Sequence, residues 1–306
     1  MGQKPFYRKD DYKEETIEQV RSLISNAKKI GYSVLAIPGE NSILCYYAGY
    51  AFAEIKDDVV KCALSGSYEK YLGSDWENIK SDLKTFINNS NNNCRNLKAL
   101  LDGVACAQPQ EHERHTQHPI AVNNISYENG SYSVCGFETA IPSTYFPDKK
   151  RPEIDLVIIC PDEHRMMLVE YKCTQGVLKG PQGVVAHGID YNNVKEKYKE
   201  IGLVSEMIKA YNLMNRIYNG NARTLTDKDI QSIDIMFLLT GSWVKRQPDE
   251  KKDTGLSVED NSRAIKMIKE TDKLNDSQKN QLFWYWCENY EDVLFEKSKY
   301  QSLNCN

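Results

Sequence analysis

An acid and a lysine stand two positions apart at the end of an apolar run, residues 166–169. They are Glu170 and Lys172, with Tyr171 between them. In an extended strand, residues two apart point to the same face and lie roughly 7 Å apart, so the carboxylate and the amine would project together from the strand end. This spacing predicts one pocket that is shared by an acid and an amine.

A second carboxylate, Asp155, stands near the head of another apolar run, residues 154–160. If the two runs are neighbouring strands, Asp155 and Glu170 offer two carboxylates to a hard cation such as Mg²⁺ (Mn²⁺ is also suitable), and the carbonyl of Tyr171 completes the set. Such a cation neutralises a scissile phosphate, generates a hydroxide-like nucleophile and stabilises the leaving oxygen. The pattern predicts phosphodiester hydrolysis, in which Lys172 positions or deprotonates the water or stabilises the transition-state charge.

The same residue types also occur without catalysis. An isolated Glu-x-Lys is common, and Asp155, Glu170 and Lys172 could equally form ion pairs at the ends of strands. The alternatives are therefore a catalytically silent protein of the same fold that binds nucleic acid or a partner, and a scaffold protein. The presence of all three residues favours the enzyme.

Composition limits the class of protein further. The chain has 306 residues, 41% of them hydrophobic, which is enough for one large domain or two modest ones. The net charge of −4 argues against a protein coated in positive charge, although a local basic groove, for example at residues 149–151, would still suit nucleic acid. The nine cysteines form no Cys-x-x-Cys pair or zinc-like cluster. We expect a cytoplasmic protein without membrane contact, because no stretch is long and apolar enough for a span or a signal region.

The first part of the chain predicts a helix followed by a small antiparallel sheet. Apolar residues at helical spacing over residues 12–30 indicate the helix. Four short β-prone runs follow, at residues 33–37, 43–47, 51–55 and 59–63. A second helix is expected over 75–87, and the polar tract 88–93 reads as a linker. We place a domain boundary there, which gives an N-terminal accessory region at 1–93 and a second domain at 94–306.

The second part predicts an α/β sheet. A helical stretch over 94–118 is interrupted near Gly103 and Pro109 and stopped by Pro119. Strands are expected over 132–141, 154–160 and 166–173, then a long helix over 194–217, a strand over 233–239, and helices over 257–271 and 276–290. The continuous apolar runs of the second and third strands indicate burial on both faces. The aromatic cluster at 283–286 is expected to pack in the core.

The segment from Pro152 to Ile159, together with residues 167–172, resembles the PD-(D/E)XK nuclease superfamily, whose fold is the restriction-endonuclease-like fold. The resemblance covers roughly residues 105–245 and includes the order helix, three strands, helix, strand. It implies a mixed sheet flanked by helices and an Mg²⁺-dependent nuclease, with DNA as a more probable substrate than RNA. Asp155, Glu170 and Lys172 match the motif positions, whereas Ile154 replaces the proline of the literal motif.

Members of the superfamily often contribute one more acid from the helix before the first core strand. Glu113 is our candidate for this acid, in preference to Glu111, and Gln117 four residues later would share its helical face. A solvated helix face is the alternative. Glu138 on the first core strand is a further candidate for the metal or for supporting a ligand, with an exposed strand acid as the alternative.

A glycine-rich turn at residues 176–183 leaves the motif strand directly. It lacks the spacing of a phosphate-binding P-loop, so nucleotide binding of that kind is not predicted. Lys179, Gln182 and His187 are weak candidates for contacts with a phosphate or the attacking water. A histidine that only starts the next helix is the simpler interpretation of His187.

Overall fold

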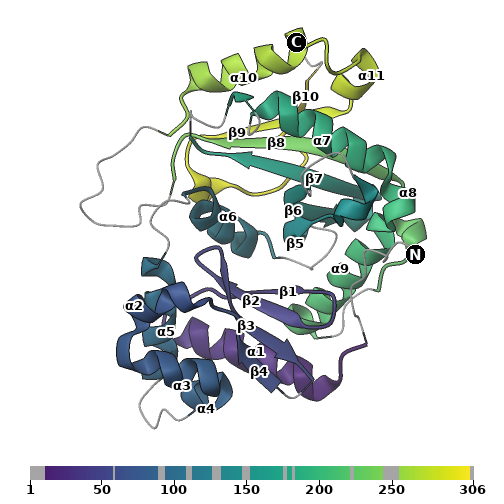
Figure 1. Cartoon of the computed structure of the whole chain (residues 1–306). Helices are drawn as coiled ribbons and strands as arrows, with labels where there is room; N and C mark the ends of the chain where they lie inside the picture. Colours follow the sequence, from purple (N-terminus) through teal and green to yellow (C-terminus); the bar gives the residue numbers. More distant parts are fainter. Residues whose placement is uncertain are drawn as a thin grey trace.

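Two β-sheets with flanking helices make up the chain, which is therefore mixed α/β (Figure 1). The computed structural model describes residues 11–57, 59–88, 94–107, 112–125, 132–146, 152–174, 178–180, 183–220, 224–243 and 255–303. Each sheet has its own cluster of buried apolar side chains, and the strands of the smaller sheet come before those of the larger sheet in the sequence. The predicted fold class is confirmed at this level.

The smaller sheet is the predicted antiparallel meander. Its strands lie in the order β1 (Leu35–Pro38), β2 (Ile43–Tyr47), β3 (Tyr50–Lys56) and β4 (Val59–Cys62). Helix α1 (Glu14–Lys29) carries acids in its first turn and lysines in its last, which suits the helix dipole. Its buried stripe packs in the same core as the sheet. The helix predicted over 12–30 and the four predicted strands are confirmed.

Short helices complete the core of the smaller sheet: α2 (Glu69–Leu72), α3 (Trp76–Ser81), α4 (Leu83–Asn88) and α5 (Arg95–Cys106). The continuous helix predicted over 75–87 is wrong, because Asp82 leaves the helical conformation and its carboxylate accepts a hydrogen bond from the Thr85 N–H at 2.9 Å. Helix α5 continues through Gly103, where the Leu72 side chain occupies the space of a Cβ.

The first core also extends beyond residue 93. Leu97, Leu100 and Leu101 of α5 lie in it and are fully buried. The boundary placed at the polar tract stays a prediction, since residues 89–93 lie outside the described ranges.

The larger sheet has the strand order β10-β9-β8-β7-β6-β5. Its strands are β5 (Ser133–Ala140), β6 (Glu153–Cys160), β7 (Arg165–Lys172), β8 (Ser232–Thr240), β9 (Leu282–Cys287) and β10 (Gln301–Ser302). The first three are antiparallel neighbours, whereas β8 is parallel to both β7 and β9. The four strands predicted over 132–239 are confirmed, and β6, β7 and β8 are buried almost throughout.

The helices of the larger sheet are α6 (His112–Asn123), α7 (Val184–Glu196), α8 (Tyr198–Ile201), α9 (Leu203–Asn219), α10 (Val258–Glu270) and α11 (Asp276–Lys279). Helix α10 confirms the helix predicted over 257–271. The single long helix predicted over 194–217 is wrong, because the helices break at Lys197 and at Gly202, whose φ of 72° is left-handed.

Two further predictions fail for physical reasons that lie in tertiary structure. The helix predicted over 276–290 is wrong, because only its start is helical (α11) and its aromatic run forms strand β9, which pairs in register with β8. Trp284 and Tyr285 are buried, as core packing requires. Pro119 does not stop its helix but lies inside α6. The lost backbone hydrogen bond is offset by packing, since Ile120 and Ala121 are fully buried and the His118 ring bonds the Ser33 carbonyl.

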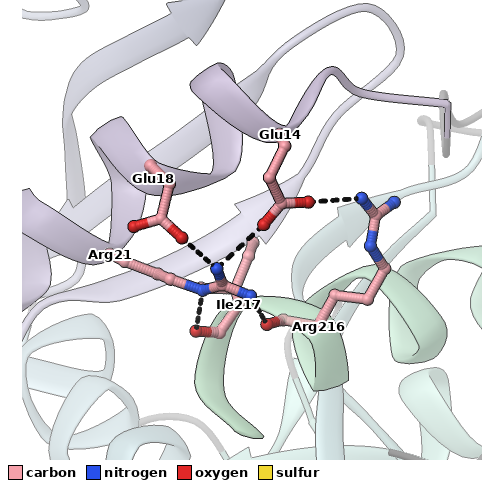
Figure 2. A network of polar contacts seen from close by, with 5 residues as sticks. All are labelled: Glu14, Glu18, Arg21, Arg216 and Ile217. Carbon is pink, nitrogen blue, oxygen red and sulfur yellow. Dashed lines mark hydrogen bonds and ion pairs between the residues drawn. The ribbon is translucent and has the colours of Figure 1, made fainter. Parts of the chain in front are cut away.

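Helix α9 joins the two cores. Its Leu213 and Ile217 side chains lie in the first core, although the helix follows the strands of the larger sheet. Figure 2 shows the polar part of this junction, where the Arg21 guanidinium of α1 donates to the carbonyls of Ile217 (3.3 Å) and Arg216 (2.5 Å). These carbonyls belong to the last turn of α9, where the Arg216 carbonyl also accepts from the Gly220 N–H at 3.2 Å. Glu14 bridges Arg21 and Arg216 at 2.9 and 3.1 Å.

Within the described ranges, every helix is too short or too polar to cross a membrane.

Candidate active site

The site begins where strands β6 and β7 stop pairing. Their ladder ends at Leu156 and Val169, so the next two positions in this register are Asp155 and Glu170. Beyond the ladder, the Tyr171 N–H donates a hydrogen bond to Asp155 Oδ2 at 2.7 Å. A side chain thus replaces a backbone acceptor, and the sequence prediction that Asp155 and Glu170 lie on neighbouring strands is confirmed.

Glu170 and Lys172 face each other as their spacing predicts. Lys172 Nζ lies 2.6 Å from Glu170 Oε1, and the two side chains are 3% and 0% exposed. Lys172 Nζ also lies 3.5 Å from Glu113 Oε1, so the candidate acid of helix α6 reaches the same pocket. This burial separates the pair from a surface ion pair, which water would screen.

Helix α7 adds two residues to the pocket. His187 Nδ1 lies 2.9 Å from Glu170 Oε1. Tyr191, one turn later, accepts a hydrogen bond from the Asp155 N–H at 3.1 Å, and its hydroxyl lies 3.3 Å from the Val169 carbonyl. Sequence reasoning missed Tyr191; its position four residues after His187, on the same helical face, was the available signal.

Glu138 reaches the site from strand β5. Phe137 pairs with Leu156 and Thr139 with Ile154, so Glu138 falls opposite Asp155 in the register. Its φ of 46° is left-handed, an uncommon and costly conformation for a residue with a side chain. Arg114 Nη2 forms an ion pair with Glu138 Oε2 at 2.8 Å. Arg114 follows Glu113 on α6 and was also missed from sequence.

Three adjacent strands therefore place one acid each along a single row: Glu138 on β5, Asp155 on β6 and Glu170 on β7. Burial and then the neighbouring Glu170 carboxylate raise the pKa of Asp155 well above its ordinary value. Burial also raises the pKa of Glu113, against the attraction of Lys172. Each proton that these two acids retain relieves their repulsion with Glu170.

Glu170 behaves in the opposite way. Burial opposes its ionisation, but Lys172 and His187 overcome this effect and lower its pKa. The same interaction raises the pKa of Lys172, because Glu170, Glu113 and Asp155 outweigh the burial of the amine. Glu170 and Lys172 are thus a charged carboxylate and a charged ammonium in a buried pocket.

The donor set suits a hard cation. Glu170 Oε2 is buried and has no hydrogen-bond partner among the residues described, although Oε1 contacts Lys172 and His187. Two carboxylates and the Tyr171 carbonyl are oxygen donors of the kind that Mg²⁺ and Mn²⁺ prefer. In the described ranges, however, no group of three or more His, Cys, Asp and Glu side chains is arranged to hold a metal ion. Lys172 is the counter-ion of Glu170 in this arrangement.

The remaining candidates are placed unevenly. Gln117 is buried on α6, one turn from Glu113, and its Oε1 has no hydrogen bond to any described residue. Lys179 is exposed and no contact joins it to the pocket in the described part of the chain. Gln182, Glu111 and the basic run at 149–151 lie outside the described residues.

Comparisons with models of protein families, with curated proteins and with solved structures found no match to this chain.

Proposed function

We propose that the protein is a metal-dependent nuclease of the PD-(D/E)XK class that hydrolyses phosphodiester bonds, with DNA as the substrate. The observation that carries the proposal is the buried Glu170–Lys172 pair, at 2.6 Å, beside Asp155 on the neighbouring strand. The sequence of helix α6, antiparallel strands β5 to β7, helices α7 to α9 and parallel strand β8 supports it, because this is the element order that the superfamily resemblance implies.

The residues divide the chemistry between them. A bound Mg²⁺ would be held by Asp155, Glu170 and the Tyr171 carbonyl and would supply charge neutralisation and an activated water. The raised pKa of Lys172 keeps its Nζ protonated, which favours water positioning and transition-state stabilisation over proton abstraction. Glu113 and Glu170 hold this ammonium from two sides.

His187 has a separate part in the proposal. Glu170 fixes the ring through Nδ1, and the buried Nε2 has no hydrogen bond to the residues described. A ring nitrogen held in this way can donate to or accept from a substrate oxygen. We assign Nε2 the role of a contact with phosphate or water.

One observation favours a second candidate, a nuclease-fold protein that binds nucleic acid or a partner without cleaving it. Lys172 already neutralises Glu170, and the described side chains contain no ready metal-binding group. The two candidates differ in whether a divalent cation displaces this ion pair.

Cleavage assays separate them. The full chain would be incubated with Mg²⁺, Mn²⁺ or EDTA and with labelled single-stranded DNA, duplex DNA and RNA. We expect metal-dependent cleavage of DNA that falls at least about a hundredfold in Glu170→Gln and in Lys172→Met. The matched control is Glu270→Gln, which removes one member of an exposed ion pair with Lys266 at 3.7 Å.

Each outcome has a defined meaning. Cleavage that survives in both folded site variants would contradict the site. If no substrate is cleaved with any of the metals, but nucleic acid is still bound in a mobility-shift assay, the protein is the silent binding protein and not a nuclease. Thermal melts of every variant distinguish lost chemistry from lost folding.

A further inference from the structure

A cavity of about 600 Å³ lies at the opposite end of the parallel strands from the candidate active site. Its floor is the start of β8, where Ile233 and Asp234 lie beside Met166 and Met167 of β7. Lys172 lies beside Leu239, at the other end of the same pair of strands. Asp234 is three residues before Phe237, the partner of Glu170, which corresponds to about 10 Å along the strand.

Two oppositely charged side chains, Lys195 and Asp234, line this cavity but do not form a hydrogen bond with each other. Lys195 Nζ of α7 lies 4.0 Å from Asp234 Oδ1, which is too far for a hydrogen bond. Among the residues described, Lys195 has no other partner for its ammonium protons. Asp234 Oδ2 lies 3.3 Å from Arg165 Nε, behind the cavity, and the aspartate residue is only 9% exposed.

Burial acts on both groups. It lowers the pKa of Lys195 and raises the pKa of Asp234, so each charged form lacks part of the solvation that water would give. A ligand that accepts from Lys195 and donates to Asp234 would restore these hydrogen bonds. Because the two groups are 4.0 Å apart, the acceptor and the donor must be neighbouring atoms on one edge of the ligand.

The lining suits a partly apolar ligand. Tyr198, Val204 and Ile230 line the cavity and are half-buried, while Gln231, Gln278 and Gln281 supply amides. An aromatic ring can pack against apolar side chains of this kind, and an attached sugar can bond the amides. The cavity volume is within the range of small-molecule sites.

A nucleobase meets these requirements, and guanine meets them best. Its O6 accepts from a lysine, and the adjacent N1–H and N2–H groups on the same edge can both converge on Asp234 Oδ1, since Oδ2 is buried beside Arg165. Adenine also presents a donor beside an acceptor but has only one donor group for the aspartate. Cytosine has the donor and acceptor but a smaller ring to fill the volume.

We propose that this cavity binds a guanine nucleotide, with Lys195 on the O6 atom and Asp234 on the adjacent N–H groups. The proposal is independent of the nuclease activity, because the two sites share no residue. The guanine can come from a free mononucleotide or from an unstacked base of a single strand.

Isothermal titration of the full chain with GMP, AMP and CMP tests the proposal, and short unstructured oligonucleotides with or without one guanine test the source. We expect GMP to bind more tightly than AMP or CMP. Lys195→Met should weaken GMP binding by about tenfold or more, because a charge-assisted hydrogen bond is lost. Asp234→Asn should reduce the preference for GMP over AMP, and Lys266→Met is the control on an exposed lysine of α10.

The results of the binding experiment can be distinguished from those of the cleavage assay. Asp234 also pairs with Arg165, so Asp234→Asn could destabilise the fold, and thermal melting checks this. If Asp234→Asn is unstable, Lys195→Met alone tests the cavity. Absence of GMP binding at millimolar concentration, or equal binding by wild type and folded Lys195→Met, would overturn the proposal. Glu170→Gln should bind GMP normally even though its cleavage is lost.

Discussion

The Tyr171 N–H and the Asp155 carboxylate are joined by a hydrogen bond of 2.7 Å across the point where two strands separate. Asp155 thereby performs two tasks, since it ends the β6–β7 ladder and places a second ionisable carboxyl group beside Glu170. These tasks can be separated by mutation, because an amide can accept the hydrogen bond without carrying the charge.

We therefore expect Asp155→Asn and Asp155→Ala to differ. The asparagine keeps an acceptor for Tyr171 and removes repulsion from Glu170, so the free energy of unfolding should equal or exceed that of the wild type. The alanine leaves the Tyr171 N–H unsatisfied and should lose about 1–3 kcal/mol. Urea unfolding at neutral pH measures the stability of both variants. An alanine variant as stable as the asparagine variant would contradict the role of Asp155 as the acceptor for the Tyr171 N–H. Both variants should lose cleavage.

Lys172 should be more costly to remove alone than together with its partner. Lys172→Met leaves the Glu170 carboxylate, which is 0% exposed, without its ammonium and should cost about 3–5 kcal/mol. Glu170→Gln combined with Lys172→Met removes both charges and should be more stable than Lys172→Met alone. The free energies of unfolding of the wild type, the two single variants and the double variant form a double-mutant cycle. Additive losses would mean that the two charges do not interact.

Gly49 should be required at the tip of the hairpin between β2 and β3. Its φ is +84°, and a Cβ there would lie 2.5 Å from the Arg114 carbonyl of α6. Gly49→Ala should therefore cost more stability than the backbone conformation alone explains. Gly31→Ala is the matched control, because Gly31 has a φ of +86° with nothing within 4 Å of its Cβ position. Urea unfolding compares the two, and equal losses would contradict the contact with α6.

His118 should make stability depend on pH. Burial lowers the pKa of this imidazole to about 4, while the unfolded chain has the ordinary value of about 6.5. Between these values the unfolded state binds a proton that the folded state does not, so stability is full above pH 6.5 and falls as the pH decreases towards 4. The loss should approach about 3 kcal/mol.

The measurement is denaturant unfolding of wild type and His118→Gln between neutral and mildly acidic pH. The glutamine does not titrate in this range, and its amide can still donate to the Ser33 carbonyl, which His118 Nε2 meets at 2.8 Å. The variant should show a shallower fall in stability with acid. Identical pH profiles would exclude His118 as the source.

Much of the larger sheet and the centre of the site could be predicted from sequence, because local patterns encode them. The apolar runs specified strands β5 to β8, and the two-residue spacing of Glu170 and Lys172 specified their common pocket. Arg114 and Tyr191 could not be found in the same way. Helical spacing places Tyr191 on the same face as His187, but neither periodicity nor composition shows which strand a helix face meets, and the roles of both residues depend on that contact.

The C-terminal aromatic run shows the same limit. Phe283 and Trp284 fit either a helix or a strand by local preference, and only the available edge of β8 decides for the strand. Pro119 is the converse case, since a strong local signal for ending a helix is overruled by the packing of α6.

The hydrogen bond between Arg21 and the Ile217 carbonyl joins residues 196 positions apart. All four strands of the smaller sheet have been synthesised by residue 62, yet part of their core comes from Leu213 and Ile217. During translation the N-terminal region must therefore wait for strands β5 to β7 and helix α9 to leave the ribosome before its own core can close. The order of the chain and the order of its folding are different.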